Sequence, residues 1–92
     1  MTYQLTFPSG LDDYDWDDIE SKGWLKGVVI AWGNQERELS IFDETRLLQA
    51  IRVDLERLGY AAIRNLIVVP RVARDEIEAT ISRLAERRFT DL

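Results

Sequence analysis

Apolar and polar residues alternate at the start of the chain, where Tyr3, Leu5 and Phe7 stand between polar neighbours. A period of two is typical of a half-buried strand. A second strand is predicted over 24–32, with one face formed by Val28, Ile30 and Trp32 and the other by Leu25, Val29 and Ala31. Gly33-Asn34 then predicts a hairpin turn, because both residues tolerate positive φ. The return strand, about 36–42, mixes charged and apolar residues and is expected at an edge or half-exposed.

Two later segments repeat apolar residues at the spacing of a helix face. The first begins at Asp43 as N-cap, ends at Gly59 and has the stripe Leu47, Leu48, Ile51, Leu55 and Leu58. The second runs from Ala73 or Arg74 to Arg88, with the stripe Ile77, Ile81, Leu84, Ala85 and Phe89. Between them, 63–69 contains four consecutive aliphatic residues and is followed by Pro70. Such a run is typical of a strand that is covered on both faces or central in its sheet.

These elements predict an α+β fold, a two-layer sandwich with both long helices on one face of the sheet. The sheet is expected to have three to four strands, mixed or antiparallel, in the order β-(short α)-β-β-α-β-α. The length of 92 residues and the hydrophobic content of 46% suit a single domain over 1–92 with one core.

The net charge of −5 is unevenly distributed along the chain. Residues 1–20 contain six acidic and no basic residues, whereas 21–92 contain 11 acidic and 12 basic ones. The acids are interleaved with two aromatic residues, Tyr14 and Trp16, in a segment that ends at Gly23. A short helix is predicted there, capped by Asp12 or Asp13. In a purely structural interpretation the acids cap this helix while Trp16 and Ile19 pack on the body of the domain.

In a functional interpretation this segment binds a basic protein, because charge attracts such a partner and aromatic side chains anchor it. The predicted partner-binding residues are Asp12, Asp13, Tyr14, Asp15, Trp16, Asp17, Asp18, Glu20 and Trp24. An immunity or inhibitor protein against a toxin is the most concrete form of this hypothesis. The alternatives are a small-molecule or metal-ion-binding regulatory domain and a structural homo-oligomer. Ala50 and Val53, opposite the leucines of the first long helix, favour a homodimer contact.

The composition argues against several classes of function. The chain has no His and no Cys, which removes the commonest general base, disulfides and thiolate metal sites, so we expect no enzyme, catalytic residue or cofactor. The run Asp13-Tyr14-Asp15-Trp16-Asp17 resembles the start of a calcium loop, but Asp18 and Trp24 stand where such a loop needs Gly and Glu, so no metal site is predicted.

The charge and the lack of long apolar segments also limit the kinds of partner and the cellular compartment that we expect. A pI near 4.6 disfavours nucleic acid as a partner. The chain contains neither an apolar run of about 18 residues nor the features of a signal peptide. We therefore expect a cytoplasmic protein that has no contact with membranes.

Overall fold

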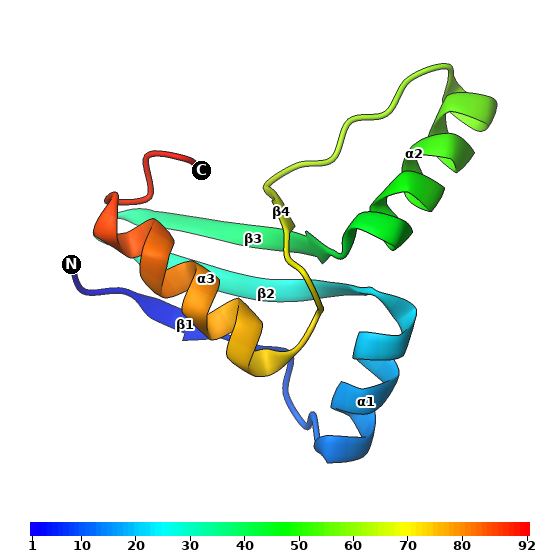
Figure 1. The fold of residues 1–92 in the computed structure, drawn as a ribbon. Coiled ribbons are helices and arrows are strands. Elements are labelled where there is room, and N and C mark those ends of the chain that lie inside the picture. Colours follow the sequence, from blue (N-terminus) through cyan, green and yellow to red (C-terminus); the bar gives the residue numbers. More distant parts are fainter.

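A computed structural model describes all residues, 1–92, and contains four strands and three helices (Figure 1). The elements, in chain order, are β1 (Gln4–Thr6), α1 (Asp13–Lys22), β2 (Trp24–Trp32), β3 (Gln35–Phe42), α2 (Glu44–Leu58), β4 (Leu66–Val68) and α3 (Arg74–Glu86). The four strands form one mixed sheet, so the predicted α+β class and element order are confirmed.

The strands are arranged in the order β1-β2-β3-β4. β2 pairs antiparallel with β1 and with β3, and Trp32 lies opposite Gln35 across the predicted two-residue turn. β4 pairs parallel with β3, with Ile67 beside Ile41, and α2 lies in the connection between them. A parallel neighbour requires such a crossover, because the chain must return to the same end of the sheet.

Two expectations about strand position are wrong. β3 is central, whereas β4 lies at the edge, and the 48% exposure of Val68 follows from that position. The aliphatic run does not form one strand covered on both faces. Ile67 packs against the core as part of β4, and Val69 is buried just after the strand ends. Ile67 and Val69 thus contribute to the core from the edge of the sheet. A run of aliphatic residues does not distinguish such an edge strand from a central one.

The predicted faces of β2 also need correction. Leu25 and Val28 are both buried, although strict alternation assigns them to opposite faces. The pairing with β3 shifts register between these two residues, and Gly27 between them has a φ of +82°. This is the geometry of a β-bulge, in which an added residue reverses the alternation. The bulge therefore brings both ends of β2 to the core.

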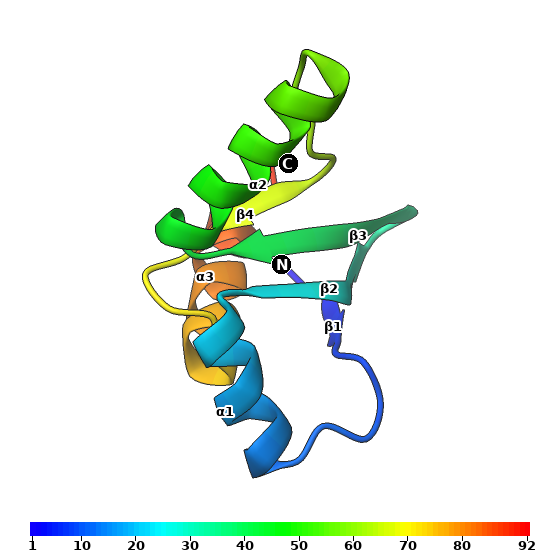
Figure 2. The ribbon, with the colours of Figure 1, turned by 90° about the vertical axis from the view of Figure 1, so that its right-hand side faces the viewer.

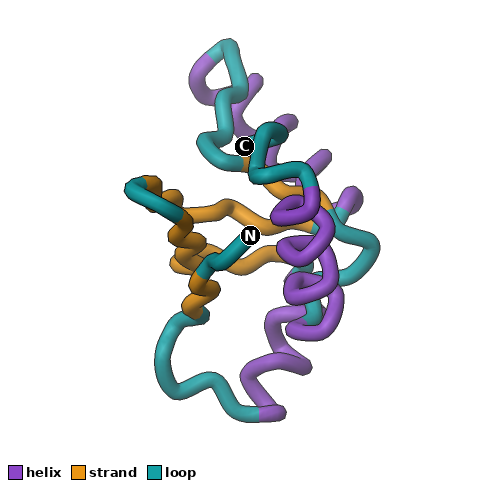
Figure 3. The backbone as a smooth tube through the Cα atoms, turned by 90° about the vertical axis from the view of Figure 1, so that its left-hand side faces the viewer, coloured by secondary structure: helices purple, strands orange, loops and turns teal.

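The core lies between one face of the sheet and α3 (Figure 3). Its buried side chains come from β2, β3, α3 and the segments that flank α3. They are Leu25, Val28, Ile30, Leu39, Ile41, Val69, Val72, Ile77, Ile81, Ala85 and Phe89. Tyr3 and Trp32 contact Phe89 with ring centroids 5.7 Å and 4.5 Å away, so the C-terminal turn closes one end of this layer.

The two long helices differ in their packing. α3 buries three of its residues, whereas α2, which was expected on the same face, buries none. Figure 2 shows α2 extending away from the end of the sheet, on the side opposite to α1. None of the three helices combines the length and apolar character needed to cross a bilayer.

Candidate functional site

The acidic segment forms α1, and its ends are fixed by local signals. Asp12 is the N-cap: its Oδ1 accepts a hydrogen bond from the backbone N–H of Asp15 at 2.8 Å. The Asp15 carboxylate in turn accepts from the N–H of Asp12 at 3.2 Å, which completes a capping box. Gly23 ends the helix with a φ of +79°. The predicted helix, its cap and its end are therefore confirmed.

The apolar residues of α1 divide between the body and the solvent. Trp16 and Ile19 pack against the core, and the Trp16 ring meets Phe7 edge-on with centroids 5.3 Å apart. Tyr14, by contrast, is 81% exposed. Of the two aromatic residues predicted as anchors, Trp16 already supports the fold and Tyr14 is free to contact another molecule.

Most of the acids on α1 have a partner within the molecule. Asp12 and Asp15 form the capping box, Asp18 pairs with Lys22 at 2.9 Å, and Glu20 pairs with Arg71 at 2.9 Å. Asp13 and Asp17 are exposed and form no ion pair. These two carboxylates are therefore the part of the acidic segment that is free to bind a cation from outside.

Arg71 ties α1 to α3. Its guanidinium donates to Glu20 from the end of α1 and to Asp75 in the first turn of α3, at 2.9 and 3.1 Å. The hydrogen bond to Glu20, followed by the charge of Asp75, raises the pKa of Arg71. The bridge links the C-terminal end of α1 to the first turn of α3, which also contains the acidic residues Asp75 and Glu76.

A recess lies between these two helices. It has a volume of about 430 Å³ and is lined by four carboxylates and one guanidinium, with the Trp16 ring as its largest apolar wall. The lining residues are Leu11, Asp13, Trp16, Asp17, Arg74, Asp75 and Glu78. Arg74 pairs with Glu78 at 3.6 Å and lies 5.3 Å from the Phe7 ring centroid. Asp75 is paired with Arg71, so Asp13 and Asp17 provide the net negative charge of the recess, and we call it the acidic recess.

The same carboxylates do not form a cation cage. The structure contains no group of three or more His, Cys, Asp or Glu residues arranged to hold a metal ion. Because Asp13, Asp15 and Asp17 are on a helix, Asp13 and Asp17 share one face whereas Asp15 lies on another and belongs to the capping box, so the three carboxylates do not converge as in a calcium loop. Of the four carboxylates that line the recess, Asp75 is already paired with Arg71 and Glu78 with Arg74, which leaves Asp13 and Asp17 for an outside cation.

Trp24, the last predicted partner-binding residue, belongs to a different surface. It lines a hollow of about 340 Å³ between the sheet and α2, together with Lys26, Arg46 and Arg64. None of these three cations forms an ion pair, and Lys26 lies 5.9 Å from the Trp24 ring centroid. The structure thus separates Trp24 from the acids with which the sequence grouped it.

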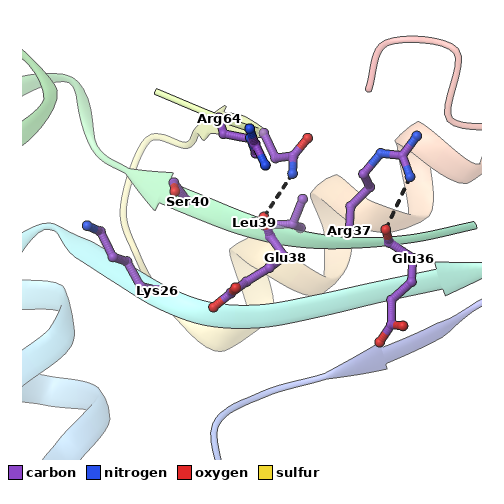
Figure 4. Close-up of a pocket in the computed structure, with 8 residues that line it drawn as sticks. Lys26, Glu36, Arg37, Glu38, Leu39, Ser40 and Arg64 are labelled. Carbon is purple, nitrogen blue, oxygen red and sulfur yellow. Dashed lines mark hydrogen bonds between the residues drawn. The ribbon is translucent and has the colours of Figure 1, made fainter. Parts of the chain in front are cut away.

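That hollow continues onto the open face of the sheet. Figure 4 shows Lys26 and Arg64 on either side of Ser40, in a shallow depression of about 690 Å³ along β3. Glu36 and Glu38 line the same depression, and the amide of Asn65 donates to the backbone oxygen of Glu38 at 3.1 Å. The charges here are mixed, so this face offers weaker electrostatic selectivity than the acidic recess.

Asp75 and Glu78 are the residues that sequence reasoning missed. In the sequence they stand in the first turns of a helix, where acids are expected for the helix dipole alone. They follow Asp17 by about 60 positions, and no local pattern links the two segments. Only the packing of α3 on the sheet brings them beside α1.

Comparison with protein-family models, with curated proteins and with solved structures finds no match to this chain. The chemistry of the acidic recess must therefore be judged from its own residues. Carboxylates attract a lysine or arginine side chain, and an indole ring packs favourably against the same cation. The recess is thus suited to accepting a basic side chain.

Proposed function

We propose that this protein is a non-enzymatic protein-interaction domain that binds a basic protein through α1 and the acidic recess. The observation that carries the proposal is the recess itself, where Asp13 and Asp17 remain unpaired beside Trp16 and the first turn of α3. An arginine or lysine of the partner would insert there, and the exposed Tyr14 would contact the surrounding surface.

The electrostatics of the molecule support this proposal. The net negative charge is concentrated in the segment that forms α1, and the remainder of the domain is nearly neutral, so a basic partner is steered toward α1 before contact. An immunity or inhibitor protein that blocks a basic toxin is the most specific form of this function. In that form the acidic face would cover the cationic surface with which the toxin binds its own target.

The experiment compares two variants that remove the same charge from different faces. Asp13→Asn/Asp17→Asn removes the unpaired carboxylates of the recess and leaves the capping residues Asp12 and Asp15 intact. Glu36→Gln/Glu38→Gln is the control, because both residues are exposed on β3, away from α1. Each protein is immobilised, captured partners are identified by mass spectrometry, and association rates are then measured with the purified partner at several salt concentrations.

We expect the captured partner to be basic and its association rate at low salt to fall about ten-fold for the α1 variant, with a weaker salt dependence. The β3 control should retain most of the rate. Equal binding by both variants would contradict the proposal, as would a partner without a basic surface.

A further inference from the structure

The apolar stripe of α2, formed by Leu48, Ile51, Leu55 and Leu58, has no counterpart within the molecule. Leu48, Leu55 and Leu58 are 51%, 50% and 55% exposed, and no residue of α2 is buried. A helix of 15 residues is marginal in water by itself, and most helices gain their stability by packing an apolar face. The caps at Asp43 and Gly59 stabilise its ends but leave the stripe uncovered.

We propose that the stripe is the contact between two copies of this chain, which pair through antiparallel α2 helices. The spacing of the stripe supports this choice of partner. Its residues follow one another by three, four and three positions, which is the a/d spacing of a coiled coil and reads the same in both directions. Two antiparallel copies related by a two-fold axis therefore place Leu48 against Leu58 and Ile51 against Leu55, and no apolar residue of the stripe lacks a partner.

The charges of α2 favour the same partner. The helix contains three acidic and three basic residues, so it is neutral within a chain of net charge −5. Two copies that meet along α2 avoid the repulsion that contact between the acidic α1 helices would cause. The antiparallel arrangement also places each helix N-terminus near the partner's C-terminus, which is the favourable orientation of the two dipoles.

The area of the stripe sets the expected strength of this dimer. Six half-exposed leucines, three from each copy, provide on the order of 500 Å² of apolar surface. With a polar rim the contact reaches roughly 1,000 Å², below the about 1,600 Å² of a standard interface. We therefore expect association at micromolar and not nanomolar concentrations. The contact is separate from the acidic recess, because α1 and α2 extend in opposite directions from the point where the end of one meets the start of the other (Figure 1).

The first test is the mass of the particle by sedimentation, from about 1 µM to about 500 µM. We expect a shift from 10.7 kDa toward twice that value, and its loss in Leu48→Glu/Leu55→Glu. Val53→Glu is the matched control, because Val53 is 47% exposed and lies on the opposite side of α2. That side, with Ala50, is the one the sequence favoured for a homodimer, so a dimer that survives Val53→Glu assigns the contact to the leucine stripe instead. A wild-type protein that stays monomeric throughout, or a control that dissociates equally, would overturn the proposal. Circular dichroism confirms that each variant is folded.

The second test addresses the antiparallel orientation. Since the chain has no cysteine, Leu48→Cys and Leu58→Cys each introduce the sole thiol of the molecule. Upon mild oxidation, an equimolar mixture of the two variants should form a disulfide-linked dimer, whereas Leu48→Cys alone should not. Preferential cross-linking of Leu48→Cys with itself would instead indicate a parallel pair and overturn the arrangement proposed here.

Discussion

At the scale of single residues, the junction between Gly23 and Asp43 connects three elements. The carbonyl of Gly23 accepts a hydrogen bond from the backbone N–H of Asp43 at 2.9 Å, so the end of α1 is held against the start of α2. Asp43 also caps α2 by accepting from the N–H of Arg46 at 2.7 Å. Gly23 is buried, has a positive φ and directly precedes β2. One backbone conformation therefore affects two helices and a strand.

We predict that Gly23→Ala lowers the free energy of unfolding by about 2–3 kcal/mol. A Cβ at this position forces alanine into a left-handed conformation and collides with the Asp43 carboxylate, whose Cγ would be 2.8 Å away. Gly59→Ala is the control, since Gly59 has nearly the same φ, +81°, with open space around it. It should cost only about 1 kcal/mol. Urea denaturation of both variants measures the difference, and equal losses would show that Asp43 moves aside freely.

At the scale of elements, α2 and α3 show that amphipathic spacing alone does not determine packing. Both helices carry apolar residues along one face, and the N-cap residue of each has an extended backbone conformation. α3 lies across the sheet and buries Ile77 and Ile81 completely, whereas the stripe of α2 remains half-exposed. The same pattern therefore forms part of the core in one helix and remains exposed in the other.

We predict a large difference in stability between one truncation in each helix. Ile81→Ala removes a side chain that is 1% exposed in the core, and it should cost about 2–5 kcal/mol because a cavity remains. Val53→Ala removes exposed atoms outside the stripe and should change stability by less than about 0.5 kcal/mol. Denaturant titrations, analysed with the same m-value for all variants, measure both changes in the free energy of unfolding. Comparable losses would indicate that α2 packs more tightly than its exposure implies.

At the scale of the whole molecule, the two proposed binding surfaces face in different directions. The molecule measures 41 × 31 × 21 Å, and α1 and α2 extend in opposite directions from their junction at Gly23 and Asp43 (Figures 1 and 2). A dimer through α2 would therefore present two acidic recesses facing away from each other. When a partner with two basic sites has bound one recess, its second site is held at a high effective concentration near the other recess, so the overall affinity rises.

Hydrogen exchange should reveal how stability is distributed over the molecule. We predict that amides of α2 exchange about 100-fold faster than those of β2 and α3 at low protein concentration. The reason is that α2 contains no buried residue, whereas opening β2 or α3 disrupts the core. Mass spectrometry of peptides from 44–58 and 74–86 would test this. Equal protection of both helices would contradict the prediction.

The amino-acid sequence by itself determined the local features of this protein. The Asp12 and Asp43 caps, the left-handed ends at Gly23 and Gly59 and the Gly33-Asn34 hairpin each depend on a few adjacent residues. The order of strands and helices, and hence the α+β class, follows from hydrophobic periods within single segments. These signals are readable because their physical causes, backbone conformation and short-range hydrogen bonds, act within one or two turns of chain.

Tertiary structure decided how those elements meet. The central position of β3, the bulge that turns both Leu25 and Val28 inward, and the exposure of the α2 stripe depend on pairings between distant segments. The same is true of the acidic recess. Asp13 and Asp17 were predicted to bind a partner, but Asp75 joined them only because α3 packs across the sheet and Arg71 bridges to α1. Strand order and register minimise the free energy of the whole chain, and no single segment of sequence contains that information.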